Sequence, residues 1–171
     1  MGTRVLVAYA SRHGSTAEIA EAVGAVLRTS GRDVDVLPVA DVIDLRAYDA
    51  VILGSAIYHG QWMAEGRSFL RRMERQRPGG PTWLFSTGPT GEHPHDGAVA
   101  AALSAPEAAR VPGDLAALAQ RAGVRGYVMF AGKVGEEATG FLERWKTRGD
   151  WRDFDRVTAW AVAIDAQLRA A

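Results

Sequence analysis

The chain has 171 residues, carries 20 basic and 20 acidic side chains, and contains no cysteine. This length corresponds to one ordinary domain, and the lack of cysteine excludes disulfides, thiolate catalysis and cysteine-ligated metal centres. The balanced charge, without a basic tail or stripe, argues against nucleic acid as a partner. Any redox chemistry must therefore depend on a bound cofactor.

The N-terminal apolar run from Val5 to Tyr9 is too short for the core of a secretory signal or for a membrane span. We therefore expect a cytoplasmic protein without a transmembrane segment, and leave open a peripheral contact with a membrane. Residues 1–171 are expected to form a single domain, and formation of a homodimer is also left open.

The first predicted elements are a buried strand and an amphipathic helix. Val5 to Tyr9 is continuously apolar, as in a strand covered on both faces of a parallel sheet. Apolar residues then recur every three or four positions from Ile19 to Leu27, which predicts a helix. Ser15 and Glu18 are spaced as a capping box at its start, and Gly31 stands where a glycine commonly ends a helix.

The middle of the chain continues this alternation. Val34 and Val36 alternate with aspartates, which indicates a strand at the edge of the sheet. A buried strand is predicted over Ala50 to Leu53, an arginine-rich helix over Ala64 to Arg77, and a short strand over Trp83 to Phe85.

The last third begins with a stretch whose structure the sequence leaves open. Thr90 to Pro112 is alanine-rich with several prolines, and either a short helix or a mobile flap fits it. A helix is predicted over Asp114 to Ala122 and a strand over Tyr127 to Ala131. Asp153 is a suitable N-cap for a final helix. Its apolar stripe is formed by Phe154, Val157, Ala161, Ile164 and Leu168.

Strands that alternate with helices predict a doubly wound, parallel α/β sheet with helices on both faces. With the alternating second strand at an edge, five strands in the order 2-1-3-4-5 fit best. In such a sheet the ligand binds beyond the carboxyl ends of the strands, where the strand order reverses. The loops after the first, third and fourth strands are therefore expected to form the site.

The first of these loops joins a buried strand to a helix N-terminus. Backbone N–H groups at a helix start bind anions, hydroxyls add donors, and a glycine lets the chain wrap closely around a ligand. A helix cap would explain Ser15 but neither the other hydroxyls nor Arg12. The glycine patterns of dinucleotide folds and of P-loops are both missing here. We expect this loop to bind a phosphate group through Ser11, Arg12, His13, Gly14, Ser15 and Thr16.

The other two loops are expected to contact a flat ring, because small residues allow close backbone approach and aromatic residues cover a ring face. The candidates after the third strand are Ser55, Ala56, Ile57, Tyr58, His59 and Gly60. The candidates after the fourth strand are Ser86, Thr87, Gly88 and Pro89. Trp62 either faces the ring or begins the core contact of the next helix. A metal site at His93 and His95 is disfavoured, because no third ligand has a suitable spacing.

These loops resemble those of flavodoxin-fold FMN proteins. Ser11 to Thr16 is similar to the hydroxyl-rich T-x-T-G-x-T phosphate loop of that family, with His13 in place of a hydroxyl residue. The resemblance implies that FMN is the cofactor and that its phosphate lies at this loop. It also implies that the isoalloxazine lies between the Tyr58–His59 loop and the Ser86–Gly91 loop.

A closer resemblance is to the menaquinone-dependent protoporphyrinogen oxidase (dehydrogenase) family. It rests on the segments Ser11–Thr16, Gly54–Gly60, Phe130–Lys133 and Gly149–Asp155. It implies an FMN-dependent oxidoreductase that acts on protoporphyrinogen IX in heme biosynthesis and uses a quinone-type acceptor. His95 to Pro112 departs from that family, because it is alanine-rich and holds a single arginine where members carry a longer insertion.

Three functions follow from these patterns. The leading one is an FMN oxidoreductase with a small-molecule redox substrate and a quinone acceptor. The alternative is a flavodoxin-type FMN electron carrier that serves a redox protein partner and has no substrate of its own. The third is a protein that keeps the fold but binds a partner instead of flavin. No catalytic residue is assigned, and Tyr58 and His59 are the nearest candidates for an acid or base.

Overall fold

The computed structural model describes residues 2–59, 61–88, 115–131, 133–134, 149–150 and 153–170. The expected helix or flap at 90–112 lies outside these residues, as do Gly60, Pro89, His93 and His95. All statements on the structure refer to the described part of the chain.

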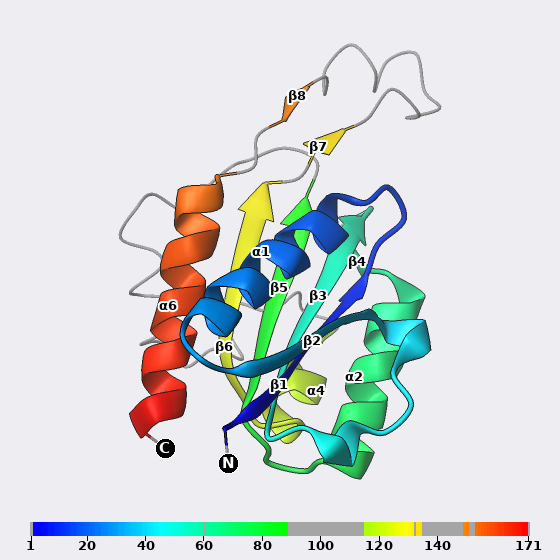
Figure 1. Cartoon of the computed structure of the whole chain (residues 1–171). Coiled ribbons are helices and arrows are strands. Elements are labelled where there is room, and N and C mark those ends of the chain that lie inside the picture. The colour runs from blue at the N-terminus through cyan, green and yellow to red at the C-terminus, as the bar shows by residue number, and fades with distance from the viewer. Residues whose placement is uncertain are drawn as a thin grey trace.

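A parallel sheet forms the centre of the molecule, with its main strands in the order β2-β1-β3-β5-β6 (Figure 1). These strands are β1 (Arg4–Ala10), β2 (Asp33–Pro38), β3 (Ala50–Tyr58), β5 (Thr82–Gly88) and β6 (Val124–Ala131). A short strand, β4 (Gln61–Trp62), pairs antiparallel with the end of β3 and lies off this path. The predicted order 2-1-3-4-5, with the alternating second strand at the edge, is therefore confirmed.

Helices cover both faces of the sheet, as predicted. On one face lie α1 (Ser15–Thr29) and α6 (Phe154–Ala170), and on the other lie α2 (Ala64–Gln76) and α4 (Ala116–Arg121) (Figure 1). The remaining elements are the 3₁₀ turns η1 (Val39–Asp41) and η2 (Leu45–Ala47) and the two-residue strands β7 (Lys133–Val134) and β8 (Gly149–Asp150). No helix in the described ranges is both long and apolar enough to cross a membrane.

The start of α1 differs from the predicted capping box. Gly14 is the N-cap, with φ of 85°, and Ser15 is already the first helical residue. Ser15 and Glu18 therefore do not occupy the cap and third positions that a capping box requires. The left-handed angle at Gly14 explains the change, because a residue without Cβ adopts this angle at little cost.

Two other helix ends agree with the sequence. Gly31, with φ of 85°, follows α1 and donates its N–H to the carbonyl of Arg28 at 2.9 Å. Asp153 caps α6, because its carboxylate accepts the N–H of Arg156 at 3.1 Å. Both predictions are confirmed, since each depends on residues within one turn of the helix end.

Strands β3 and β5 are longer than predicted. The small and polar residues expected to form loops continue β3 to Tyr58 and β5 to Gly88. They pair across the sheet in register, with Ser55 opposite Ser86. Pairing with a neighbouring strand stabilises an extended backbone even where the side chains have low strand propensity.

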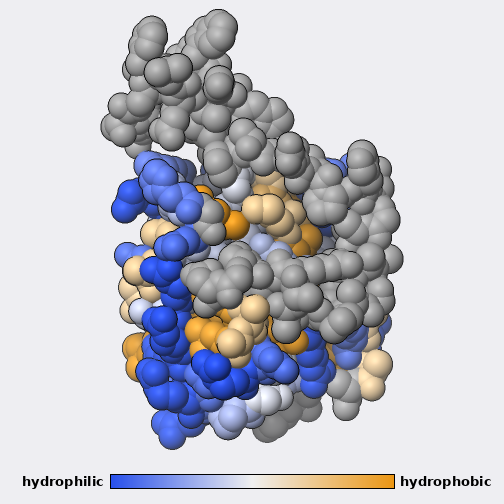
Figure 2. Space-filling model, turned by 180° about the vertical axis from the view of Figure 1, so that it is seen from behind, coloured by the Kyte–Doolittle hydropathy of each residue, from blue (hydrophilic) through white to orange (hydrophobic). Residues whose placement is uncertain are grey.

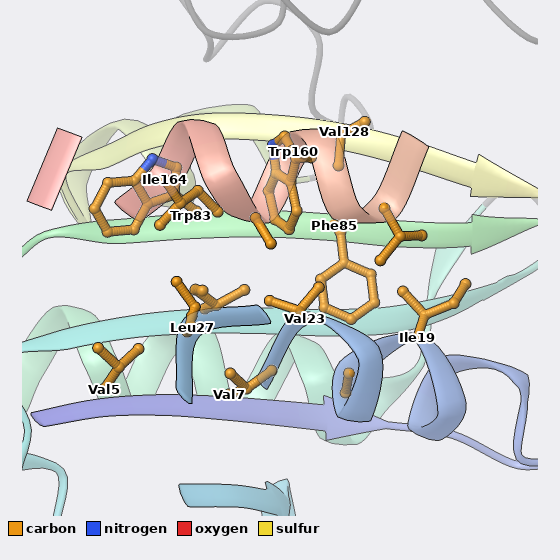
Figure 3. Packing of buried hydrophobic residues seen from close by; sticks show 14 of the residues in the cluster. Val5, Val7, Ile19, Val23, Leu27, Trp83, Phe85, Val128, Trp160 and Ile164 are labelled. Atoms are coloured by element: carbon orange, nitrogen blue, oxygen red, sulfur yellow. The ribbon is translucent and has the colours of Figure 1, made fainter. Parts of the chain in front are cut away.

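The core between the sheet and the α1–α6 layer contains three aromatic side chains in mutual contact. The rings of Phe85, Phe130 and Trp160 have centroids 5.7 to 6.0 Å apart, and Figure 3 shows Phe85 and Trp160 among the surrounding aliphatic residues. Trp160 is not part of the predicted stripe of the last helix, whereas Phe154, which is part of it, is 41% exposed. The buried face of α6 therefore includes Trp160 and largely leaves out Phe154, which differs from the face that the spacing predicts.

The α2 side of the molecule has a polar outer surface. The solvent face of α2 carries the exposed residues Arg71 and Arg75. Seen from behind, hydrophilic residues form a column on the side where α2 lies, and apolar residues are visible beside it (Figure 2). The inner face of α2 packs Phe69, Leu70 and Met73 against the sheet, which confirms the predicted arginine-rich amphipathic helix.

Candidate functional site

The predicted site lies at the carboxyl ends of β1, β3 and β5. Strand β1 stands between β2 and β3, so the order reverses at this strand. The loop after β1 leads into α1, and the end of β3 turns into β4. The fold thus brings the first and second predicted loops to one edge of the sheet (Figure 1), where open α/β sheets bind ligands.

The loop after β1 is organised around Gly14. Its N–H donates to the hydroxyl of Ser11 at 3.1 Å. Because the hydroxyl oxygen acts as the acceptor in this bond, its own hydrogen can still be donated to a ligand. A Cβ on Gly14 would meet no atom of the described residues within 4 Å, so this part of the structure leaves space open beside the glycine. The first N–H groups of α1 have no acceptor within the helix and point out of its N-terminus.

This donor set fits a phosphate group. It combines helix N-terminal amides, the hydroxyls of Ser11 and Ser15, and the exposed guanidinium of Arg12. A helix N-terminus also carries a partial positive charge, which stabilises an anion there. His13 is exposed at the same loop.

Thr16 has a role that the sequence does not reveal. Its side chain is buried, and its hydroxyl lies 2.7 Å from the hydroxyl of Thr87. This bond joins the first turn of α1 to the end of β5. The side chains of both threonines are therefore internal, although the backbone N–H of Thr16 remains part of the helix N-terminus.

Tyr58 brings the first two loops into contact. The Arg12 guanidinium carbon lies 5.4 Å from the centroid of the Tyr58 ring, and the His13 ring lies edge-on at 6.2 Å. Burial raises the pKa of the Tyr58 phenol above its ordinary value, and the charge of Arg12 offsets only part of this rise. The phenol is therefore neutral at physiological pH, and its ring lies beside the loop after β1.

His59, the next residue, has an unusual backbone. Its φ is 51°, and it is the only non-glycine residue in the described ranges with a positive φ. This conformation is uncommon for residues with a Cβ and persists where surrounding structure holds it. Its exposed side chain stands at the rim of the candidate site.

Two serines among the predicted contacts point into the protein. The Ser55 hydroxyl accepts the N–H of Met63 at 3.2 Å and donates to the carbonyl of Ala56 at 3.0 Å. The Ser86 hydroxyl accepts the indole N–H of Trp62 at 2.7 Å and the Tyr127 hydroxyl at 2.9 Å. Both serine side chains are fully buried, so a ligand at this edge would reach their backbone atoms rather than their hydroxyls.

The remaining predicted contacts are mostly covered. Ala56 and Gly88 are buried, and Ile57 is half-buried where it pairs with Trp62. Trp62 itself is 2% exposed and packs in the core on the α2 side. Of its two predicted roles, the structure therefore supports the core contact and excludes a ring-facing one.

Comparisons with known proteins agree with this fold. The family model for a flavodoxin domain matches residues 6–148. A solved flavodoxin from the domain Archaea aligns at a TM-score of 0.66 and 17% identity, covering 97% of this chain and 99% of that one. A flavodoxin from Streptococcus pneumonia TIGR4 aligns at a TM-score of 0.62 and 20% identity, covering 96% and 99%.

A flavodiiron protein from Giardia intestinalis aligns at a TM-score of 0.62 and 14% identity, and the match covers 98% of this chain but 36% of that protein. No curated protein sequence matches the chain. The structural likenesses show the fold, and the family model covers most of the chain. The chain therefore belongs to the flavodoxin domain family, which implies FMN as its cofactor.

Proposed function

We propose that the protein is an FMN-dependent oxidoreductase of the protoporphyrinogen dehydrogenase kind, with a quinone-type acceptor. The observation that carries the flavin site is the joint placement of the Gly14 loop and the Tyr58 ring at the switch point of the sheet. A cytoplasmic location is part of this proposal.

In this proposal the loop after β1 holds the phosphate through Ser11, Arg12, Ser15 and the first amides of α1. Tyr58 and His59 border the ring on one side, and the end of β5 borders it on the other. Bound FMN supplies transfer of one or two electrons, while the protein orients it and limits the access of water. The neutral phenol of Tyr58 suits a contact with a flat, largely apolar ring.

The support for a porphyrinogen substrate is the resemblance of four segments of the sequence, among them Ser11–Thr16 and Gly54–Gly60. Each two-electron step would remove two hydrogens from the porphyrinogen, and the quinone would take up two electrons and two protons to become a quinol. This balance needs no further oxidant, and it needs no cysteine or metal ligand from the chain.

A flavodoxin-type electron carrier is the second candidate. The near full-length match with the archaeal flavodoxin, in both directions, favours it. The two functions differ in one measurable property: the enzyme would reduce its flavin with protoporphyrinogen alone, whereas the carrier would need a redox protein partner.

The first experiment is a titration of the apoprotein with FMN, followed by flavin fluorescence. Quenching that saturates at one FMN per chain supports the proposal, and unchanged fluorescence contradicts it. The loaded protein is then mixed anaerobically with protoporphyrinogen, with and without menaquinone. Bleaching of the flavin that menaquinone reverses supports the enzyme, and a flavin that stays oxidised favours the carrier.

Substitution of two glycines tests the position of the phosphate. Gly14 and Gly31 share φ of 85°, and within the described part of the chain a Cβ added to either would meet no atom within 4 Å, but only Gly14 lies at the candidate site. Gly14→Ala and Gly31→Ala should therefore strain the backbone equally. We expect FMN affinity to fall at least about tenfold in Gly14→Ala only. Equal affinities in the two variants would place the phosphate elsewhere.

A further inference from the structure

The turn that carries Tyr58 and His59 is part of a very short hairpin. Strand β4 has two residues, which pair antiparallel with Ile57 and Tyr58 of β3. A hairpin of this size is not stable in water by itself. The positive φ of His59 adds local strain. Contacts outside the hairpin must therefore hold its turn in place.

Hydrogen bonds from the end of the sheet supply such contacts. The indole N–H of Trp62, the last residue of β4, donates to Ser86 of β5 at 2.7 Å. The hydroxyl of Tyr127, on β6, donates to the same serine oxygen at 2.9 Å. Ser86 thus links three strands, and the exposed fractions of these side chains are 2% for Trp62, 0% for Ser86 and 7% for Tyr127.

Close packing by α2 adds to these bonds. A Cβ on Gly66 of α2 would lie 2.9 Å from the Ser55 hydroxyl and 3.3 Å from the Trp62 ring. Ser55 in turn accepts the N–H of Met63, immediately after β4. The base of the hairpin is therefore enclosed between the sheet and α2, while its turn reaches the candidate site.

We propose that Ser86, Trp62 and Tyr127 form a positioning triad, which holds the β3–β4 hairpin so that Tyr58 and His59 stand at the cofactor site. Ser86 is the essential member, because it accepts both hydrogen bonds and its loss leaves two buried donors unpaired. The hairpin part of this inference depends on the described contacts alone, and its effect on FMN rests on the proposed function.

Hydrogen exchange of the apoprotein tests the first part. In Ser86→Ala, the amides of residues 57–62 should exchange about tenfold faster than in the wild type, after correction for global stability. Thr82→Val is the matched control, because Thr82 is also a buried hydroxyl of β5 but bonds the carbonyl of Gly80 at the opposite end of the strand. It should leave these amides unchanged.

The FMN dissociation constant tests the second part. It should rise at least about tenfold in Ser86→Ala and stay within about twofold in Thr82→Val. Tyr127→Phe removes one of the two donors and keeps the ring, so it should give a smaller rise in hairpin exchange and in the FMN dissociation constant. This variant replaces Ser86→Ala in both tests if Ser86→Ala does not fold. Exchange that accelerates equally in both variants, or in neither, would overturn the triad.

The two proposals fail in different ways. A wild-type protein that does not bind FMN contradicts the proposed function, yet faster exchange of the hairpin in Ser86→Ala would still support the triad. A wild type that binds FMN, with unchanged hairpin exchange and unchanged affinity in Ser86→Ala, contradicts the triad and leaves the function standing.

Discussion

Two buried tryptophans, Trp160 on one face of the sheet and Trp62 on the other, differ in what their indole N–H binds. On the α1–α6 face, Trp160 is fully buried and its indole N–H has no hydrogen-bond partner among the described residues. On the α2–α4 face, Trp62 is just as buried, but its N–H is bound to Ser86. One side chain thus fills volume among Phe85 and Phe130, whereas the other fixes the position of a hairpin beside the site. Equal burial thus accompanies two different roles, and the hydrogen bond of the indole N–H is what distinguishes Trp62 from Trp160.

The largest expected effect is on the packing face. A Cβ on Gly54 would overlap the Phe85 ring, so the ring occupies the space beside this glycine. Phe85→Ala should lower the free energy of unfolding by about 4 kcal/mol, and Gly54→Ala should lower it by about 3 kcal/mol through overpacking. Combined, they should cost clearly less than the sum, because the new methyl group enters the cavity. Urea unfolding of the four proteins measures this, and simple additivity would contradict it.

The second effect concerns the ion pair that joins α6 to Arg32, which lies between α1 and β2. Asp165 is 4% exposed and accepts hydrogen bonds from Arg32 Nε at 2.7 Å and from Arg169 Nε at 2.8 Å. Asp165→Asn should cost about 3 kcal/mol at neutral pH, because it leaves Arg32, whose side chain is only 12% exposed, without its counter-charge. Arg169→Gln is the control. Because Arg169 is the more exposed partner, its loss should lower the free energy of unfolding by less than about 1 kcal/mol.

The same pair gives a pH dependence with a definite sign. Burial by itself would raise the pKa of Asp165, but the hydrogen bonds and charges of Arg32 and Arg169 outweigh it and hold the pKa below its ordinary value of 3.8. The stabilisation is therefore complete above about pH 4 and is lost as the pH falls through the lowered pKa. The difference between the wild type and Asp165→Asn in urea unfolding should shrink only below about pH 4. A difference that changes between about pH 5 and 8 would contradict this assignment.

The third effect compares the two tryptophans directly. Trp62→Phe leaves Ser86 with one donor fewer and opens a gap under the hairpin, so we expect a loss of about 3 kcal/mol. Trp160→Phe also loses volume but removes an unpaired buried N–H, so we expect a loss of about 1.5 kcal/mol. Urea unfolding measures both. Equal losses would show that the hydrogen bond to Ser86 contributes nothing beyond packing.

The smallest effect is at the hydroxyl pair that connects α1 to β5. Thr16→Val and Thr87→Val should each lower the free energy of unfolding by about 1.5 kcal/mol, because each leaves one buried hydroxyl without its partner. The double variant should be no worse than either single one, since two apolar groups then face each other. A double variant that loses the full sum would contradict a direct bond between them.

Much of the fold could be predicted from the sequence because its signals are local. The continuous apolar run of β1, the alternation in β2 and the repeats in the helices report which side of each element is buried, and burial follows from periodicity. Gly31 and Asp153 are predicted correctly because a helix end depends on residues within one turn. The prediction of a phosphate loop depends on local signals of the same kind, since its glycine, hydroxyls and helix start are contiguous.

The tertiary structure decided which partner each polar side chain has. Nothing adjacent in the sequence could show that Thr16 meets Thr87, or that Ser86 binds Trp62 and Tyr127, because these partners are 24 to 71 residues apart. A serine near the end of a strand has the same neighbours in the sequence whether its hydroxyl binds a ligand or bonds inside the protein. Strand pairing extended β3 and β5 into the predicted loops and turned two expected ligand contacts inward. A hydroxyl bonds to whichever donor or acceptor the fold places within about 3 Å, and that distance exists only once the strands are side by side.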